Sequence, residues 1–184
     1  VQTAPPSDQP NTTAAVTAQP LALELPTMDT ATVKPEAEPA ATPAIAPADT
    51  AGLANPLQTY DTMKFLVEKY PQVFWGVHLH NTRGLALANT FASLQAGVVE
   101  FGACFAGIGG CPFAPGASGN SAMEDVIFLM ERVGVKHGVD LETYIGIADK
   151  VQSYIGRDTD TYQLHVSRAH AALAACSEGS EVRN

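Results

Sequence analysis

Two imidazoles, a thiol and an amide are the side chains of this sequence whose types and spacing could do chemistry. His78 and His80 are separated by one residue at the end of an apolar run, and Cys111 and Asn120 follow in a glycine-rich segment. If the run is a strand, alternation points both imidazoles to one face, where they can bind one metal ion. A short His-x-His pattern is also typical of histidines that hydrogen-bond to backbone, so both interpretations stay open.

The glycine-rich segment, residues 107–119, surrounds the thiol. Cys111 lies between Gly110 and Pro112, which restricts its freedom. Glycines such as Gly109 and Gly110 adopt backbone conformations that other residues avoid, and they would let the segment fold over a bound molecule. We therefore expect Gly109, Gly110 and Pro112 to shape a substrate loop.

The thiol and the amide each have two interpretations. Near a metal or an imidazole, the Cys111 thiol exchanges protons close to neutrality and can act in catalysis. Otherwise it is a buried, inert thiol, which is our expectation for Cys104 and Cys176. Asn120 precedes a predicted helix, so it either caps that helix or offers its carbonyl oxygen to a hard cation.

Helices and strands alternate in the part of the chain that carries these residues. Apolar periodicity, glycines and prolines predict helices over 59–70, 84–96 and 141–155, and strands over 73–80 and 98–105. Ser121 and Glu124 have the spacing of a capping box, which predicts a further helix that begins there. Both strands are expected to be buried, with Trp75, Val77 and Leu79 facing the helices. This order predicts an α/β fold of parallel βα units, with the histidines at the carboxyl end of a strand, where such folds place active groups.

Composition divides the chain into three parts. Residues 1–56 hold ten of the 13 prolines and no aromatic residue, so we predict a disordered Pro/Ala/Thr-rich tail. Residues 57–156 have the composition of a folded domain. Residues 157–184 form a polar carboxyl-terminal extension, to which the sequence assigns no role, with His165 and His170 facing solvent.

Charge and cysteine content exclude several classes of protein. The formal net charge is −9 and the pI about 4.8, which argues against a nucleic-acid partner. No apolar run is long enough to span a membrane. Three cysteines are too few for a disulfide framework, and no secretory or mitochondrial leader is recognisable, so we expect a reducing, cytoplasmic location.

Two motifs resemble the 3-hydroxy-3-methylglutaryl-CoA lyase family, within the metal-dependent aldolase-like barrels. They are His-Leu-His-Asn-Thr-Arg-Gly-Leu-Ala-Leu-Ala-Asn, residues 78–89, and Gly-Ile-Gly-Gly-Cys-Pro-Phe-Ala-Pro-Gly-Ala-Ser-Gly-Asn, residues 107–120. The resemblance runs from about residue 57 to residue 155. Isopropylmalate and homocitrate synthases share the His-x-His strand, and the Gly-Gly-Cys-Pro segment points to the lyases.

The resemblance implies a (β/α)₈ barrel, of which this chain holds the carboxyl-terminal part. It implies cleavage of an acyl-CoA substrate to acetoacetate and acetyl-CoA, as in leucine catabolism. A divalent ion, Mg²⁺ or Mn²⁺, would be held by His78, His80 and Asn120. Cys111 would supply a proton to the departing acetyl-CoA enolate.

The sequence departs from the family pattern at two places. A whole barrel takes about 250 residues and eight strands, whereas two strands are predicted here, and the first-strand Asp and Arg of the family have no counterpart. Gly102 stands where an Asp is expected on the second strand. Two alternatives therefore stay open. One is an incompetent fragment that associates through unpaired strand edges, for example as a homo-oligomer. The other is another metal barrel, such as an amidohydrolase.

Overall fold

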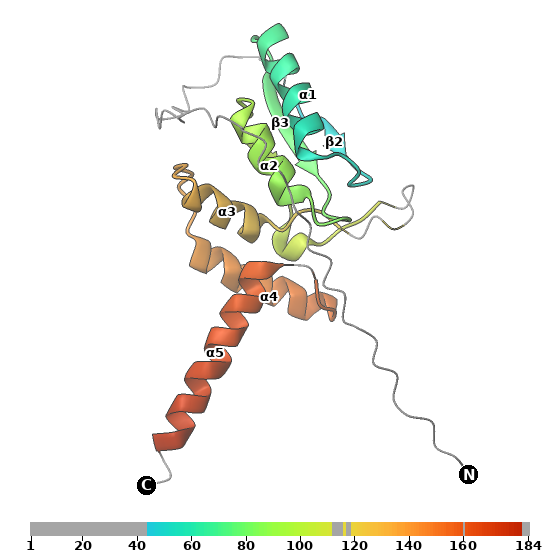
Figure 1. Ribbon diagram of the computed structural model, residues 1–184. Coiled ribbons are helices and arrows are strands. Elements are labelled where there is room, and N and C mark those ends of the chain that lie inside the picture. The colour runs from blue at the N-terminus through green and yellow to red at the C-terminus, as the bar shows by residue number, and fades with distance from the viewer. Residues whose placement is uncertain (1–43, 112–115, 117–118, 160, 182–184) are drawn as a thin grey trace, which may run out of the picture.

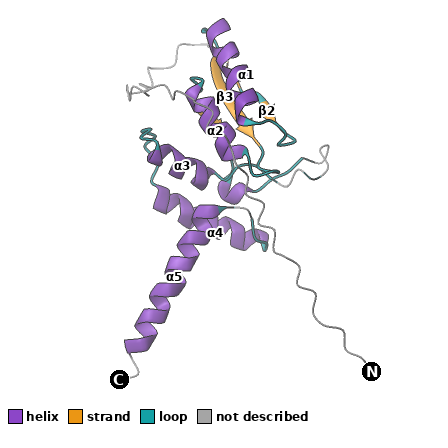
Figure 2. Ribbon diagram, viewed as in Figure 1, coloured by secondary structure: helices purple, strands orange, loops and turns teal. Residues whose placement is uncertain are grey.

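A computed structural model of the chain describes residues 44–111, 116, 119–159 and 161–181. The chain forms a small parallel sheet with helices packed on it, followed by three further helices (Figures 1 and 2). The elements are β1 (Ala44–Ile45), β2 (Ala48–Asp49), α1 (Pro56–Lys69), β3 (Phe74–Leu79), α2 (Ala86–Gln95), β4 (Glu100–Gly102), the 3₁₀ turn η1 (Phe105–Gly107), α3 (Met123–Arg132), α4 (Leu141–Ile155) and α5 (Tyr162–Glu181). The predicted α/β class is confirmed.

Strand β3 is the centre of the sheet. It pairs in parallel with β4 on one edge and with β1 and β2 on the other. Strands β1 and β2 pair with β3 in the same register, with Ala44 opposite Phe74 and Ala48 opposite His78. They are therefore one strand interrupted before Pro47, whose carbonyl accepts a hydrogen bond from the His78 amide at 3.0 Å.

This interrupted strand corrects the predicted tail boundary. Residues 44–55 were assigned to a disordered segment that ends at residue 56, yet they contain β1 and β2 and lead directly into α1. The proline and small residues of this segment show none of the alternation that predicts a strand. The segment is extended because the edge of β3 offers hydrogen bonds to its backbone. The rest of the predicted tail, residues 1–43, lies outside the described residues.

Helices α1 and α2 cover one face of β3 (Figure 1). Trp75, Val77 and Leu79 are buried there, as predicted, in a core with Met63, Ala86, Ala96 and Val98. The other face is covered less completely, because Phe74 keeps 44% of its surface exposed. The expectation that this strand is buried on both faces therefore holds for Gly76 and not for Phe74.

The start of α3 differs from the predicted capping box. The helix begins at Met123 after Ala122, which makes no side-chain cap. Ser121 instead donates its hydroxyl to the Leu79 carbonyl at 3.1 Å. Glu124 is fully buried, and its carboxylate accepts from the Ala106 amide at 3.1 Å and the Thr161 hydroxyl at 2.6 Å.

The carboxyl-terminal extension folds into α5, which contacts α3 and α4 and then extends away from them (Figure 1). Asp125 accepts from the amides of Tyr162 and Gln163 and so caps α5. Burial raises the pKa of Asp125, although these two hydrogen bonds act in the opposite direction and lower it. His165 and His170 are exposed, as predicted.

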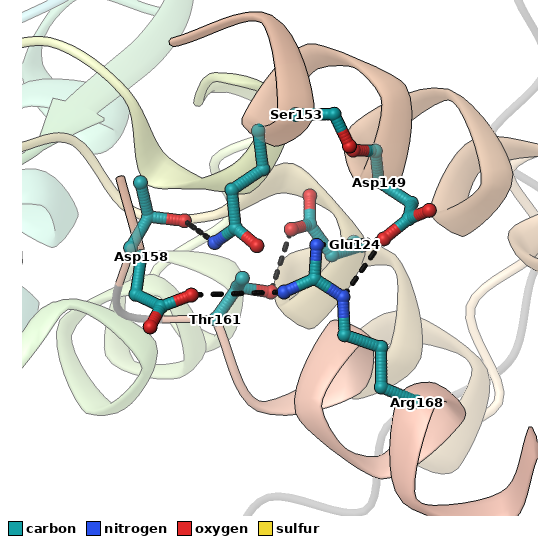
Figure 3. Close-up of polar contacts among 8 residues, drawn as sticks. Glu124, Asp149, Ser153, Asp158, Thr161 and Arg168 are labelled. Atoms are coloured by element: carbon teal, nitrogen blue, oxygen red, sulfur yellow. Dashed lines mark hydrogen bonds and ion pairs between the residues drawn. The ribbon is translucent and has the colours of Figure 1, made fainter. Parts of the chain in front are cut away.

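A polar cluster joins α4 to the start of α5 (Figure 3). Arg168 binds Asp149 at 2.7 Å and lies 3.7 Å from Asp158, while Thr161 reaches back to Glu124. The extension is thus tied to the fold through hydrogen bonds at its beginning. None of the described helices is long and apolar enough to cross a membrane.

Candidate functional site

The two imidazoles lie where the sequence predicts them, at the carboxyl end of β3. Their ring centroids are 5.2 Å apart and the ring planes meet at 79°. His78 is half-buried, whereas His80 is buried. Burial, and then the neighbouring His78, lower the pKa of His80 against the opposing charge of Asp49, which favours the neutral ring that a metal ion would require.

Asn120 lies beside His80 because the chain returns to the end of β3 after the glycine-rich segment. The backbones of His80 and Asn120 form an antiparallel bridge, flanked by hydrogen bonds from Asn81 to Gly119 and from Ser121 to Leu79. Asn120 does not cap α3, which begins three residues later, so the helix-cap interpretation is wrong.

The amide of Asn120 has a defined orientation. Its Nδ2 donates to the Ile108 carbonyl at 2.9 Å and to the Cys104 Sγ at 3.0 Å. Its Oδ1 is buried and has no hydrogen-bond partner within the described structure. A buried oxygen without a donor costs about 1–3 kcal/mol, so a water molecule or a bound cation would stabilise this atom.

The glycine-rich segment packs directly on this amide. A Cβ at Gly109 would lie 2.5 Å from the Asn120 Nδ2, and φ there is +120°, so only glycine fits. Cys111 is half-buried and follows Ile108 by three residues, a span of at most about 11 Å. Pro112 lies outside the described residues, and Gly110 is exposed.

The side chains present fit a divalent ion in part. His80 Nδ1 and Asn120 Oδ1 are both buried without a partner, and both are metal-ligand types. The described residues contain no group of three or more His, Cys, Asp or Glu that could hold an ion. A metal here would therefore depend on the amide oxygen of Asn120, with further oxygens coming from substrate, water or other parts of the protein.

Two positions explain why no carboxylate joins this set. Asp49, at the end of β2, is near enough for its charge to raise the pKa of His80 against burial, but its two oxygens each accept a backbone amide, from Leu53 and Ala54 at 2.9 and 3.0 Å. Gly102 lies opposite His78 in the sheet, and a Cβ there would be 3.2 Å from the His78 Nδ1. An aspartate at this position would sit beside that ring; glycine leaves it without one.

A small cavity of about 110 Å³ adjoins Asn120 and includes residues that sequence reasoning left without a role. Its lining combines the two ends of the glycine-rich segment with the connection between α4 and α5: Asn81, Gly107, Gly119, Asn120, Arg157, Asp158 and Thr159. The sequence offered no signal for this approach, because residues 107 and 157 are brought together only by the packing of α4 on η1.

Comparison with known proteins places these motifs in context. The chain matches the family model described as HMGL-like over residues 12–151. Hydroxymethylglutaryl-CoA lyase YngG of Bacillus subtilis is 37% identical over 121 residues, covering 66% of this chain and 40% of that protein. (R)-citramalyl-CoA lyase of Chloroflexus aurantiacus is 44% identical over 110 residues, covering 60% of this chain and 35% of that protein.

A solved structure supports the same relationship. The HMG-CoA lyase of Acinetobacter baumannii, in complex with coenzyme A and 3-methylmalate, superposes with a TM-score of 0.58 at 39% identity and covers 62% of this chain. This chain spans 37% of that protein. The family match also extends into residues 12–56, which lie before the resemblance seen in the sequence.

Proposed function

The chain belongs to the HMGL-like family, and from this premise we propose that it supplies the metal-binding and proton-donating part of a carbon–carbon lyase. The substrate class is a 3-hydroxyacyl-CoA, with 3-hydroxy-3-methylglutaryl-CoA as the first candidate. Cleavage of that substrate gives acetoacetate and acetyl-CoA. The observation that carries the proposal is the pair of unpartnered buried atoms, His80 Nδ1 and Asn120 Oδ1, next to the segment that bears Cys111.

His78, His80 and Asn120 would hold the divalent ion, Mg²⁺ or Mn²⁺. When bound, such an ion polarises the oxygens of the substrate and acidifies its tertiary hydroxyl. The neutral His80 ring and the fixed Asn120 amide present their atoms without rearrangement, which keeps the substrate oriented.

Cys111 would act as the general acid. Transfer of the hydroxyl proton to a water molecule lets the bond between the carbinol carbon and the CH₂ next to the thioester break, with the electron pair moving onto the thioester enolate. The Cys111 thiol then gives its proton to that carbon and completes acetyl-CoA. Gly109 and Gly110 give the segment the freedom to bring the thiol over the substrate.

Two chemically similar acyl-CoA molecules are candidate substrates. 3-Hydroxy-3-methylglutaryl-CoA and citramalyl-CoA share a tertiary hydroxyl on the carbon β to the thioester and differ by one CH₂ before the carboxylate. The chain is 44% identical to a protein that bears the second activity in its name and 37% identical to one that bears the first. The same proton transfers serve both, so citramalyl-CoA is the second candidate.

A non-catalytic role is the alternative. The chain spans 40% of its Bacillus relative, and Asp49, a carboxylate whose charge acts on His80, already accepts two backbone amides. In that case the open edges of the sheet would bind another chain, and a homo-oligomer is one such partner. Cytoplasmic location likewise stays a prediction.

The test is cleavage of the two acyl-CoA substrates by the purified chain in the presence of Mn²⁺, followed by acetyl-CoA release. We expect metal-dependent product from at least one substrate, abolished by a chelator and restored by Mn²⁺. A chain that binds Mn²⁺ but releases no acetyl-CoA from either substrate would favour the non-catalytic alternative.

A further inference from the structure

Cys104 has a contact that an inert thiol would not need. Sequence reasoning treated it as buried and without function, yet its Sγ accepts a hydrogen bond from the Asn120 Nδ2 at 3.0 Å. The two residues are 16 positions apart in the chain. The contact therefore exists only because the glycine-rich segment turns back on itself.

The backbone of Cys104 is held on both sides. Its amide donates to the Ser121 carbonyl at 3.1 Å, and its carbonyl accepts from the amides of Gly107 and Met123 at 3.1 and 2.9 Å. A parallel bridge links it to Ala122. The thiol is thus presented from a rigid position between the end of β4 and the start of α3.

The two acceptors around Asn120 decide which way its amide points. The Ile108 carbonyl can only accept, so the NH₂ group must face it and the carbonyl oxygen must face away. The Cys104 sulfur accepts from the same NH₂ group and restrains its plane. Glycine at position 109 leaves room for the NH₂ group, because a Cβ there would lie 2.5 Å from Nδ2.

The oxygen that this arrangement turns away is the unpartnered one. Asn120 Oδ1 is buried and has no donor among the described residues, and the backbone of Asn120 is paired with that of His80. An amide that was free to rotate would turn this oxygen towards any available donor. The sulfur contact helps to hold this oxygen in its unpartnered position.

We propose that Cys104 is a positioning residue that holds the Asn120 amide so that its oxygen is ready for a divalent cation. The inference rests on the metal-binding part of the proposed function. It does not make the sulfur a ligand; the thiol acts through Asn120. Residues that orient ligands in this way commonly change metal affinity by 10–100-fold when removed.

The test compares Mn²⁺ affinity, without substrate, in the unaltered chain and in Cys104→Ala, Cys104→Ser and Cys176→Ala. Cys104→Ala is expected to weaken Mn²⁺ binding about 10-fold. Cys104→Ser keeps an acceptor for the amide and is expected to restore binding to within about threefold. Cys176 is exposed on α5, so the prediction that it is buried is wrong. It serves as the control and should leave the affinity unchanged. Urea unfolding of each variant separates a local effect from loss of the fold.

Several outcomes would overturn the inference. They are an unchanged affinity in Cys104→Ala, an equal loss in Cys104→Ser and Cys104→Ala, or no Mn²⁺ binding by the unaltered chain. A sulfur-to-metal charge-transfer band in the Co²⁺-loaded chain that disappears in Cys104→Ala would make the thiol a direct ligand instead. If Cys104→Ala does not fold, the Cys104→Ser affinity decides. Failure of acyl-CoA cleavage with the expected Mn²⁺ pattern intact would remove the proposed function but leave this inference standing.

Discussion

Replacing Cys111 by alanine is expected to lower the rate of acyl-CoA cleavage by about 10²–10⁴-fold, the range typical for loss of a positioned general acid. The thiol lies three residues beyond Ile108, whose carbonyl binds the Asn120 amide, and the proposed mechanism brings it over the substrate. Alanine cannot protonate the enolate, and only water would remain to do so. The measurement is acetyl-CoA release at saturating Mn²⁺.

Metal affinity separates this effect from damage to the site. Cys111→Ala should bind Mn²⁺ as the unaltered chain does, because Cys111 is not among the proposed ligands. Cys176→Ala is the matched control, since it removes an exposed thiol on α5 and should cleave at the unaltered rate. Equal cleavage rates in Cys111→Ala and Cys176→Ala would remove Cys111 from the mechanism.

Replacing Glu124 by alanine is expected to lower the free energy of unfolding by about 3 kcal/mol. The carboxylate is fully buried and is the acceptor for the Ala106 amide and the Thr161 hydroxyl. Both donors are themselves buried, so alanine would leave them unsatisfied. Ala106 also has a left-handed backbone, with φ of 52°, which the bond from Glu124 helps to hold.

Two further variants serve as controls for Glu124→Ala, and urea unfolding measures the stability of all three. Glu124→Gln keeps an oxygen for the Ala106 amide and an NH₂ group for the Thr161 oxygen, so it should lose only about 1 kcal/mol. Glu68→Ala removes an exposed glutamate from α1 and should change stability by no more than about 0.5 kcal/mol. A loss in Glu124→Ala as small as that in Glu68→Ala would contradict the role given to this carboxylate.

Elements with strong local signals were predictable from the sequence. Helix α4 has both ends as predicted, because Asp140 caps its first turn and Gly156 ends it with φ of 66°. Strand β3 is a long run of apolar and β-branched residues, and the alternation along it correctly placed Trp75, Val77 and Leu79 in the core.

Features that depend on partners far along the chain were not predictable. Strands β1 and β2 have two residues each and exist because the edge of β3 offers hydrogen bonds. Ser121 and Glu124 match a capping box in spacing, but the Leu79 carbonyl and the Thr161 hydroxyl, distant in sequence, take their side chains. A local sequence pattern does not show that a partner distant in the chain will take the side chain instead.

The candidate site likewise has one part that was predictable from the local sequence and one part that was not. The spacing of His78 and His80 on a strand was enough to place both rings at one end of β3, 5.2 Å apart. The turn that brings Asn120 beside His80 uses Gly109 and Gly119, where a Cβ would lie 2.5 Å from a neighbouring atom, and the sequence gives no direction for that turn. The contact between Asn120 and Cys104 depends on the same turn.

The most direct test of the metal-binding account is to add Mn²⁺ to the histidine-labelled chain and follow the imidazole NMR signals. A paramagnetic ion broadens the signals of nearby nuclei and leaves distant ones sharp. We predict that substoichiometric Mn²⁺ removes the signals of His78 and His80 while those of His165 and His170, exposed on α5, persist. Loss of the α5 signals with those of His78 and His80 unchanged would contradict a metal site at the end of β3.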